Sequence, residues 1–201
     1  MTFNIGLIIN PLAGLGGSVA LKGSDDVASE ALALVAVPKA NARCPQALAE
    51  VADLDVCVYA FAGDMGANCA LSAVLKTDVD GKAKTQPSSA ADTISAAQML
   101  LTRGVDLLVF VGGDGTARDL LSAIGDQVPV VGIPAGVKIH SGVYGITPMA
   151  AGQVIAQLIK GELVSLRSQE VRDIDEQEFR AGRVKARYYG ELQVPESHQY
   201  M

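Results

Sequence analysis

Residues 107–116 read Leu-Leu-Val-Phe-Val-Gly-Gly-Asp-Gly-Thr, and they govern how the rest of the sequence is interpreted. The first five residues are apolar without alternation, which is typical of a strand that is buried on both faces. A glycine-rich turn follows directly, and residues 114–124 have the spacing of a helix. We therefore predict a strand over 106–111 that ends in a tight turn and leads into a helix.

Similar apolar runs occur three more times before residue 161, separated by stretches with helical start and stop signals. Strands are predicted over 3–9, 56–61 and 128–133, and helices over 24–35, 45–53, 64–75, 88–103 and 148–160. Residues 76–87 show no period and are predicted to be a loop. Because buried strands alternate with helices, we predict an α/β fold whose doubly wound, mostly parallel sheet spans residues 1–161.

The sequence changes character after Gly161. Charged residues make up 14 of the 40 residues in 162–201 but only 24 of the 161 residues before them. Apolar and polar residues alternate over 184–194, which predicts a half-buried antiparallel strand, and residues 163–172 are its candidate partner. A two-stranded ribbon alone is marginally stable in water, so 162–201 should pack on the first domain, pair with another chain or begin a further β-rich domain. We favour the last of these.

Composition excludes several classes of protein. The chain has 201 residues, of which 49% are hydrophobic, so it can bury a core without disulfides or a structural metal. A net charge of −6 and an aromatic content of 4% argue against a nucleic-acid binder. The three cysteines show no CxxC spacing, and no apolar run approaches the roughly 20 residues that span a bilayer. We expect a soluble cytoplasmic protein whose thiols are small buried side chains.

Turns of glycine and other small residues follow the four predicted strands at their carboxyl ends. In a parallel sheet these ends share one edge, where doubly wound folds bind their ligands. Glycines let the backbone come close to a ligand, and helix starts offer N–H groups to phosphate. We therefore predict a site for a phosphate-bearing ligand; glycines that only permit tight turns are the alternative. The candidates in these turns are Asn10, Pro11, Gly14, Gly16, Gly17, Gly112, Gly113, Gly115 and Gly136, with Asp64 a weaker one.

Asp114 is the most specific candidate because it lies between Gly113 and Gly115, directly after a buried strand. Its carboxylate could accept a proton from an attacking hydroxyl or act through a metal, or it could simply cap the helix. Thr116, in the first helical turn, could donate to phosphate or only to the backbone. Asp119, further along the same helix, is either a second carboxylate at the site or a solvated residue.

The loop after the last of these strands carries the remaining candidates. Lys138 could neutralise phosphate, His140 could bind a ligand or serve in acid–base chemistry, and Ser141 is a weaker candidate. A solvated or structural role is the alternative for His140. Lys22 is a weaker phosphate-binding candidate, with an ordinary surface lysine as its alternative. The Walker pattern is absent, and the dinucleotide pattern GxGxxG is only half met because position 19 is valine.

The segment Gly112-Gly-Asp-Gly-Thr116 after a hydrophobic strand resembles the motif of the NAD kinase and diacylglycerol kinase superfamily. The turn Asn10-Pro-Leu-Ala-Gly14 resembles the opening turn of the same superfamily. The similarity is closest to the N-terminal domain of the ATP-NAD kinase-like branch, which includes acetoin-catabolism X-type proteins. The stretches that resemble this branch are 6–17, 21–24 and 132–141, within a resemblance that covers residues 3–195.

This resemblance implies a kinase that uses ATP, or polyphosphate, with magnesium and that phosphorylates NAD to NADP. In such a protein the glycine-rich motif binds the donor phosphates, and Asp114 assists deprotonation of the acceptor hydroxyl. We expect small nucleotides as partners, neither nucleic acid nor a membrane, and a homo-oligomer. The alternatives are a non-catalytic nucleotide-binding module and a kinase for another small hydroxylated acceptor.

Two departures from the family pattern bear on the acceptor. The resemblance implies a C-terminal β-sandwich domain with an Asn-Asp/Glu motif in NAD kinases, but this chain has no asparagine after Asn68. Arg118-Asp119 also stands where lipid-kinase members often have Asn-Glu, which argues against a lipid acceptor. We therefore expect the chain to be the N-terminal part of a longer kinase, for which 201 residues alone could be inactive.

Overall fold

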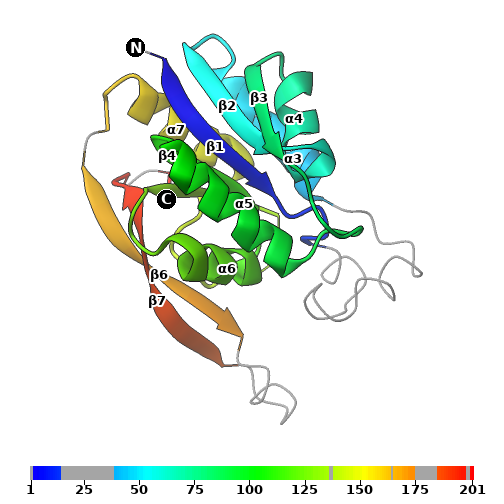
Figure 1. The fold of residues 1–201 in the computed structure, drawn as a ribbon. Helices are drawn as coiled ribbons and strands as arrows, with labels where there is room; N and C mark the ends of the chain where they lie inside the picture. The colour runs from blue at the N-terminus through cyan, green and yellow to red at the C-terminus, as the bar shows by residue number, and fades with distance from the viewer. Residues whose placement is uncertain (1, 15–38, 136–137, 164, 175–184, 198–199) are drawn as a thin grey trace.

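A computed structural model of the chain describes residues 2–14, 39–135, 138–163, 165–174, 185–197 and 200–201. Within these residues, five parallel strands form a central sheet in the order β3-β2-β1-β4-β5 (Figure 1). Their bounds are β1 Phe3–Ile9, β2 Val56–Phe61, β3 Lys76–Gly81, β4 Leu107–Gly112 and β5 Val130–Pro134. The order reverses between β1 and β4, so the predicted doubly wound sheet is confirmed.

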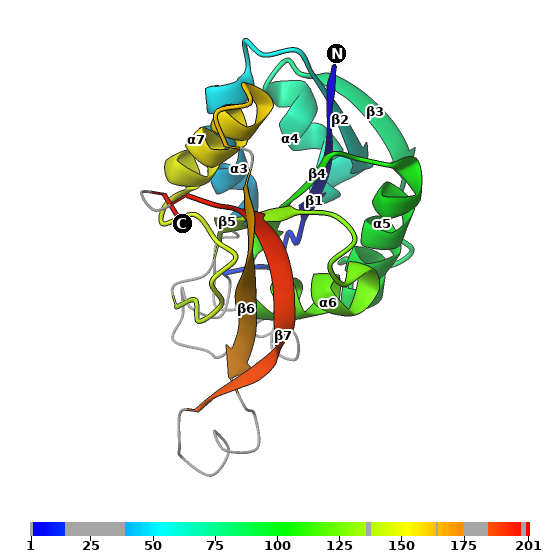
Figure 2. The same cartoon turned by 90° about the vertical axis from the view of Figure 1, so that its left-hand side faces the viewer.

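Helices cover both faces of this sheet, which explains why most of its strands are apolar without alternation. In β4, Val109 and Val111 face one apolar cluster, whereas Leu108 and Phe110 face the other, and all four are fully buried. Figure 2 shows the two groups of helices on either side of the sheet. On one face lie α3 (Ala40–Leu48), α4 (Ala67–Ser72) and α7 (Pro148–Ile159), and on the other α5 (Ala90–Arg103) and α6 (Asp114–Ile124).

Capping residues set the boundaries of two helices as predicted. Ser89 caps α5 by accepting from the Asp92 N–H, and Asp92 accepts in return from the Ser89 N–H. Gly104 ends the same helix in the left-handed conformation. Thr147 caps α7 by accepting from the N–H three residues further on, with Pro148 in the first helical position.

Several predicted boundaries were wrong. Residues 76–81, predicted as loop, form the edge strand β3, whose polar and largely exposed side chains give no apolar signal. Pro45 suggested the start of a helix, but it lies inside α3, which begins at Ala40 and continues into the 3-10 helix η1 (Ala49–Val51). The helix predicted over 64–75 is divided into the 3-10 helix η2 (Gly63–Met65) and the short α4. The predicted helix over 24–35 lies outside the described residues.

In the described C-terminal region, β6 (Leu166–Ile174) and β7 (Ala186–Pro195) form a two-stranded antiparallel sheet, which we call the ribbon. Val171, Leu192 and Val194 are fully buried and join the cluster that α5 and α6 form with the sheet. The ribbon continues past the central sheet (Figure 2). The predicted antiparallel strand and its partner are thus confirmed, and one end of the ribbon packs on the α/β part of the chain.

The three cysteines, Cys44, Cys57 and Cys69, are free and buried, as predicted. Cys44 on α3 and Cys69 on α4 belong to the same apolar cluster. Hydrogen bonding to Cys69 and burial raise the pKa of the Cys44 thiol. Among the described helices, none combines the length and the apolar character needed to cross a bilayer.

The close contact between α3 and α7 depends on Gly152. A Cβ atom here would clash with the Ala47 carbonyl oxygen of the α3 backbone. Alanine normally stabilises a helix by about 1 kcal/mol relative to glycine. We nevertheless expect Gly152→Ala to lower the free energy of unfolding by about 1–3 kcal/mol, because the two helices must separate.

Urea denaturation measures this difference. Gln157→Ala on the same helix is the control and is expected to change the free energy of unfolding by less than about 0.5 kcal/mol. An unchanged or higher stability of Gly152→Ala would show that the helices move apart at no cost.

Candidate functional site

The carboxyl ends of β1, β4 and β5 meet at one edge of the sheet, which we call the rim. The Asn10 N–H after β1 donates to the Val111 carbonyl of β4 at 3.0 Å. The Ala135 N–H after β5 donates to the Gly112 carbonyl, also at 3.0 Å. Three of the predicted turns therefore lie side by side, at the place where the strand order reverses and where doubly wound folds bind ligands.

Asn10 joins the first turn of the rim to the start of α6. Its Oδ1 accepts from the backbone N–H two residues further on at 3.1 Å, and its Nδ2 donates to Thr116 Oγ1 at 3.2 Å. Pro11 lies in this turn, and Gly14 ends it with φ +83°. A Cβ atom on Gly14 would clash with the Ala135 carbonyl oxygen of the neighbouring turn, so the close approach of the two turns requires glycine.

The start of α6 presents backbone N–H groups at the rim. Gly113 is the N-cap, and no side chain of the described residues caps the helix there. A Cβ atom on Gly113 would meet no atom of the described residues within 4 Å, so on that side the described structure leaves space. On Gly112, in contrast, a Cβ would strike the buried Thr116 side chain. Uncapped N–H groups and the positive end of the helix dipole favour an anion at this point.

Asp114 is the first residue of α6, and only 6% of its side chain is exposed. Its Oδ2 lies 2.9 Å from the His140 backbone nitrogen and 3.0 Å from the His140 ring Nδ1. Its Oδ1 accepts from the Ser141 N–H at 3.0 Å and from the Ser141 hydroxyl at 2.7 Å. The carboxylate therefore joins the start of α6 to the loop that follows β5.

Two further contacts hold this loop. Ser141 Oγ accepts from the Arg172 N–H of β6 at 3.0 Å and lies 2.8 Å from the Arg172 carbonyl oxygen. The Tyr144 hydroxyl donates to the Gly113 carbonyl at 2.6 Å, and its ring packs edge-on against Phe110. The loop, the helix start and the ribbon thus form one connected unit.

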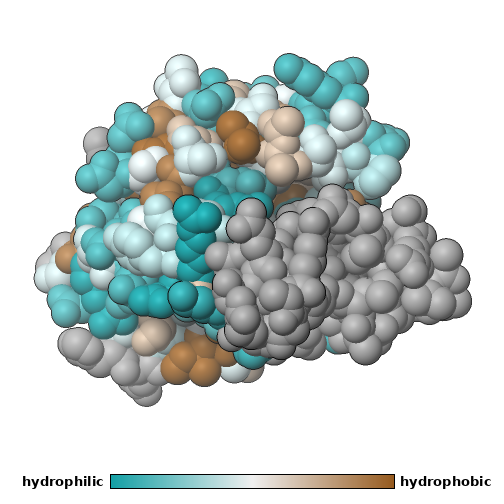
Figure 3. Space-filling view, turned by 90° about the horizontal axis from the view of Figure 1, so that it is seen from below, coloured by the Kyte–Doolittle hydropathy of each residue, from teal (hydrophilic) through white to brown (hydrophobic). Residues whose placement is uncertain are grey.

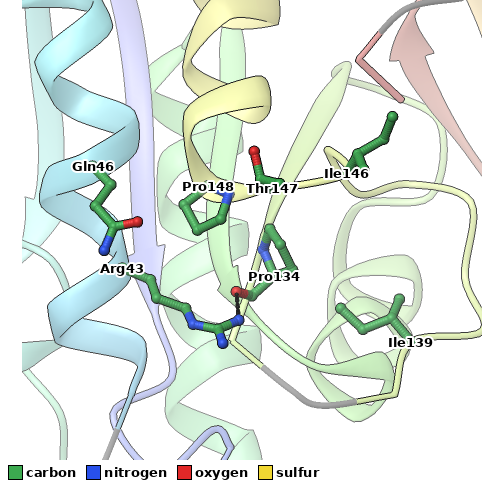
Figure 4. A pocket seen from close by; sticks show the side chains of 7 residues that line it. All are labelled: Arg43, Gln46, Pro134, Ile139, Ile146, Thr147 and Pro148. Carbon is green, nitrogen blue, oxygen red and sulfur yellow. Dashed lines mark hydrogen bonds between the residues drawn. The ribbon is translucent and has the colours of Figure 1, made fainter.

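A cavity of about 520 Å³ opens beside the rim, between α3, β5 and the start of α7 (Figure 4). Near the start of α3, Arg43 lines it, and its guanidinium donates to the Pro134 carbonyl at 2.6 Å. Ile139, which directly precedes His140 in the sequence, lines the same cavity. Arg43 is not among the residues predicted for the site, because the helix was predicted to begin at Pro45, two residues after it.

The comparisons with known proteins identify the family. The family model described as the ATP-NAD kinase N-terminal domain matches residues 5–163. The chain belongs to the ATP-NAD kinase family. Membership of this family indicates a kinase-type phosphotransferase domain. A comparison with curated proteins gives no match.

Two solved structures are similar to this member of the ATP-NAD kinase family. One is a diacylglycerol kinase from Bacillus anthracis str. Sterne, with 17% identity over 86% of this chain and a TM-score of 0.37. The other is assigned as a diacylglycerol kinase of the same strain, with 18% identity over 87% of this chain and a TM-score of 0.39. The matches cover 43% and 44% of those chains, so this chain spans less than half of their length.

The structure brings several of the predicted residues together. Asp114, His140 and Ser141 form one hydrogen-bonded cluster. Thr116 is buried in the first turn of the same helix. Lys138 is exposed in the loop that carries His140.

Seen from below, hydrophilic side chains cover much of the described surface, and hydrophobic ones form separate patches (Figure 3).

Other predicted residues lie apart from this cluster or outside the described part of the chain. Asp64 is exposed in η2 and accepts from Asn68 Nδ2 at 3.0 Å, which is a local contact. Asp119 is half-buried further along α6, where its carbonyl accepts from the Ser122 hydroxyl. The candidates outside the described residues are Gly16, Gly17, Lys22 and Gly136.

Arg118, which was predicted to argue against a lipid acceptor, attaches the ribbon to α6. Its Nη1 lies 3.1 Å from Asp173 Oδ2 on β6. Its guanidinium carbon lies 5.5 Å from the centroid of the Tyr189 ring on β7, within cation–π range. Packing of the ribbon therefore accounts for an arginine at this position.

Burial raises the pKa of Tyr144, and the charges of Asp114 and Asp173 raise it further. The folded protein thus holds the hydroxyl proton more tightly than the unfolded chain does. This contribution to stability is complete below about pH 10 and is lost as the pH rises further. We expect Tyr144→Phe, which lacks the hydrogen bond to Gly113, to be less stable by about 0.5–1.5 kcal/mol at pH 7. This deficit should shrink above about pH 10.

Urea unfolding of the wild type and Tyr144→Phe between about pH 7 and pH 11 measures this change. Tyr188→Phe, which removes the hydroxyl of a half-exposed tyrosine on the ribbon, is the control, and it is expected to change the free energy of unfolding at pH 7 by less than about 0.5 kcal/mol. A constant deficit for Tyr144→Phe would show that the phenol ionises equally in the folded and unfolded states.

Proposed function

We propose that this protein is a kinase that transfers a phosphoryl group from ATP, or from polyphosphate, to NAD and so makes NADP. One observation carries the proposal: a helix start that has a glycine N-cap and suits phosphate lies directly beside the buried carboxylate of Asp114. Family membership supports the kinase class. In this arrangement a phosphate and a hydroxyl would meet at the rim, next to this carboxylate.

The donor phosphates would bind the N–H groups at the start of α6, on the open side of Gly113. Fixed N–H dipoles stabilise the charge that spreads over a phosphoryl group during transfer. Because the chain has a net charge of −6, an anionic donor needs a local source of positive potential. The helix start supplies part of it, and the exposed Lys138 in the neighbouring loop would supply more.

The acceptor would enter through the cavity beside the rim. Its volume of about 520 Å³ is typical of pockets for small molecules. Arg43 offers a guanidinium there, which suits the pyrophosphate of NAD. The apolar wall that includes Ile139 would contact the flat faces of the nucleotide. This placement would bring a ribose hydroxyl of NAD toward the Asp114 cluster.

Catalysis would depend mainly on positioning and on stabilisation of charge. Asp114 is proposed to assist removal of the hydroxyl proton. The described residues contain no group of three or more His, Cys, Asp or Glu side chains that could hold a metal ion, and both oxygens of Asp114 already accept hydrogen bonds. A magnesium ion would therefore be held through the phosphates of ATP, whose negative charge it neutralises.

The reaction itself is the first test, run with the full-length gene product. With ATP, magnesium and NAD, we expect NADP, measured with an NADP-specific dehydrogenase, and an equal amount of ADP. ADP without NADP would indicate another hydroxylated acceptor. Calorimetric binding of ATP with neither product would indicate a non-catalytic nucleotide-binding module. Polyphosphate in place of ATP tests the donor.

Gly113→Val tests the phosphate position separately from the fold. Gly113 has an extended backbone, with φ −119° and ψ −171°, which valine adopts readily, and a Cβ here meets no atom of the described residues within 4 Å. We therefore expect the melting temperature to stay the same or rise slightly, whereas KM for ATP rises by at least about tenfold because the side chain occupies the phosphate space.

Lys76→Val is the matched control, since it places the same side chain at an exposed strand position at the opposite end of the sheet. Its KM for ATP is expected to remain that of the wild type. A Gly113→Val protein with unchanged KM for ATP would contradict the proposed phosphate position.

A further inference from the structure

We propose that His140, rather than Asp114 itself, receives the proton of the acceptor hydroxyl, and that Asp114 is the positioning residue that holds the imidazole. The inference rests on the proposed function and deepens it, because it concerns the acid–base chemistry of the same rim. It follows from how the hydrogen bonds of the buried carboxylate are distributed.

The carboxylate of Asp114 has little capacity left for a substrate proton. An ionised carboxylate accepts through about four lone-pair sites. Three nitrogen donors and one hydroxyl lie within 3.0 Å of its two oxygens, all from His140 and Ser141. The Ser141 hydrogen can instead go to the Arg172 carbonyl, but the three nitrogen donors remain. A substrate hydroxyl could reach this carboxylate, 6% exposed, only by displacing one of them.

The same contacts orient the His140 ring. An ionised carboxylate only accepts hydrogen bonds, so Nδ1 at 3.0 Å from Asp114 Oδ2 must carry a hydrogen. Nε2 is then left with its lone pair, and no described residue bonds to it. With 18% of its side chain exposed, the ring is accessible at the rim. A carboxylate that holds an imidazole in this way selects its tautomer and stabilises the imidazolium that forms when a proton arrives.

The backbone around the ring is fixed as well. The His140 N–H donates to the same Oδ2 that contacts the ring, so main chain and side chain are held by one atom. Ser141 is attached to β6 through the Arg172 N–H, and Tyr144 is attached to the Gly113 carbonyl. Acid–base catalysis requires a base held in position against the hydroxyl, and this loop meets that requirement.

Neighbouring groups are poorer proton acceptors than His140. Asp173 is paired with Arg118 at 3.1 Å. The Tyr144 hydroxyl donates to a carbonyl, and the raised pKa of this buried phenol keeps it protonated. Lys138 carries a positive charge and would stabilise phosphate rather than accept a proton. The imidazole of His140, in contrast, has a ring nitrogen whose lone pair can accept a proton.

The transfer step balances without a further reagent. A lone pair of the acceptor hydroxyl oxygen forms the new bond to the γ-phosphorus of ATP. The bond from this phosphorus to the bridging oxygen breaks, and its electron pair leaves on ADP. The hydroxyl proton passes to His140 Nε2, where the Asp114 carboxylate stabilises the imidazolium until the proton is released to water.

The kinetic test compares His140→Asn with Asp173→Asn in the full-length protein. Asparagine can still donate to Asp114 but has no ring nitrogen to take a proton, so we expect kcat to fall by about 10²–10⁴-fold. The KM values for ATP and NAD should change by less than about threefold, because the binding contacts remain. Asp173→Asn removes a neighbouring carboxylate, and its kcat should stay within about threefold of the wild type.

A spectroscopic test needs no substrate. Nitrogen-15 NMR of histidine side chains distinguishes an Nδ1–H from an Nε2–H imidazole, and the His140→Asn spectrum assigns the signal. We expect the Nδ1–H form for His140 in the wild type and a shift toward Nε2–H in Asp114→Ala, which lacks the acceptor. An Nε2–H imidazole in the wild type would overturn the inference.

These outcomes separate the inference from the function on which it rests. If His140→Asn makes NADP with a kcat within about threefold of the wild type, the inference is wrong, but the proposed function is supported. If the wild type forms neither NADP nor ADP, the proposed function is wrong, and the inference that rests on it is wrong as well. Loss of kcat in His140→Asn, with the Nδ1–H form in the wild type, supports both.

Discussion

The buried carboxylate at the start of α6 is the interaction on which the rim depends. A buried negative charge is strongly destabilising unless donors surround it. Here the donors come from the loop after β5, so the charge can be buried only when that loop folds back onto the helix start. Through Ser141 the same contacts reach β6. One charged group thus holds together segments that are far apart in the sequence.

Burial explains which parts of the fold could be predicted from the sequence. The strands over 3–9 and 56–61 were predicted with their observed bounds, because strands covered on both faces leave uninterrupted apolar runs. β3 was missed because it lies at the edge of the sheet, where most of its side chains face water. This segment is a strand because it pairs with β2, and such pairing cannot be recognised from its amino-acid composition.

The candidate site was predictable to the extent that it follows from topology. A parallel sheet brings the turns after its strands to one edge, which is why Asn10, Gly112 and Asp114 could be placed there. Topology does not determine where a carboxylate points, so the contact between Asp114 and His140 could not be derived. The contacts of Arg118 could not be derived from topology either. This residue was predicted to argue against a lipid acceptor, and the structure shows that it attaches the ribbon to α6 through Asp173 and Tyr189.

The polar edge of the sheet has a consequence for the behaviour of the protein at high concentration. An unpaired edge strand is a template on which another chain can add a strand and begin to aggregate. On β3, however, Asp78 is paired with Arg103 at 2.7 Å, and Lys76 is exposed at the start of the strand. A strand from a second molecule could dock here only by stripping water from these charges. Among the described residues β3 pairs with β2 alone, and the charges on this edge oppose growth into fibrils.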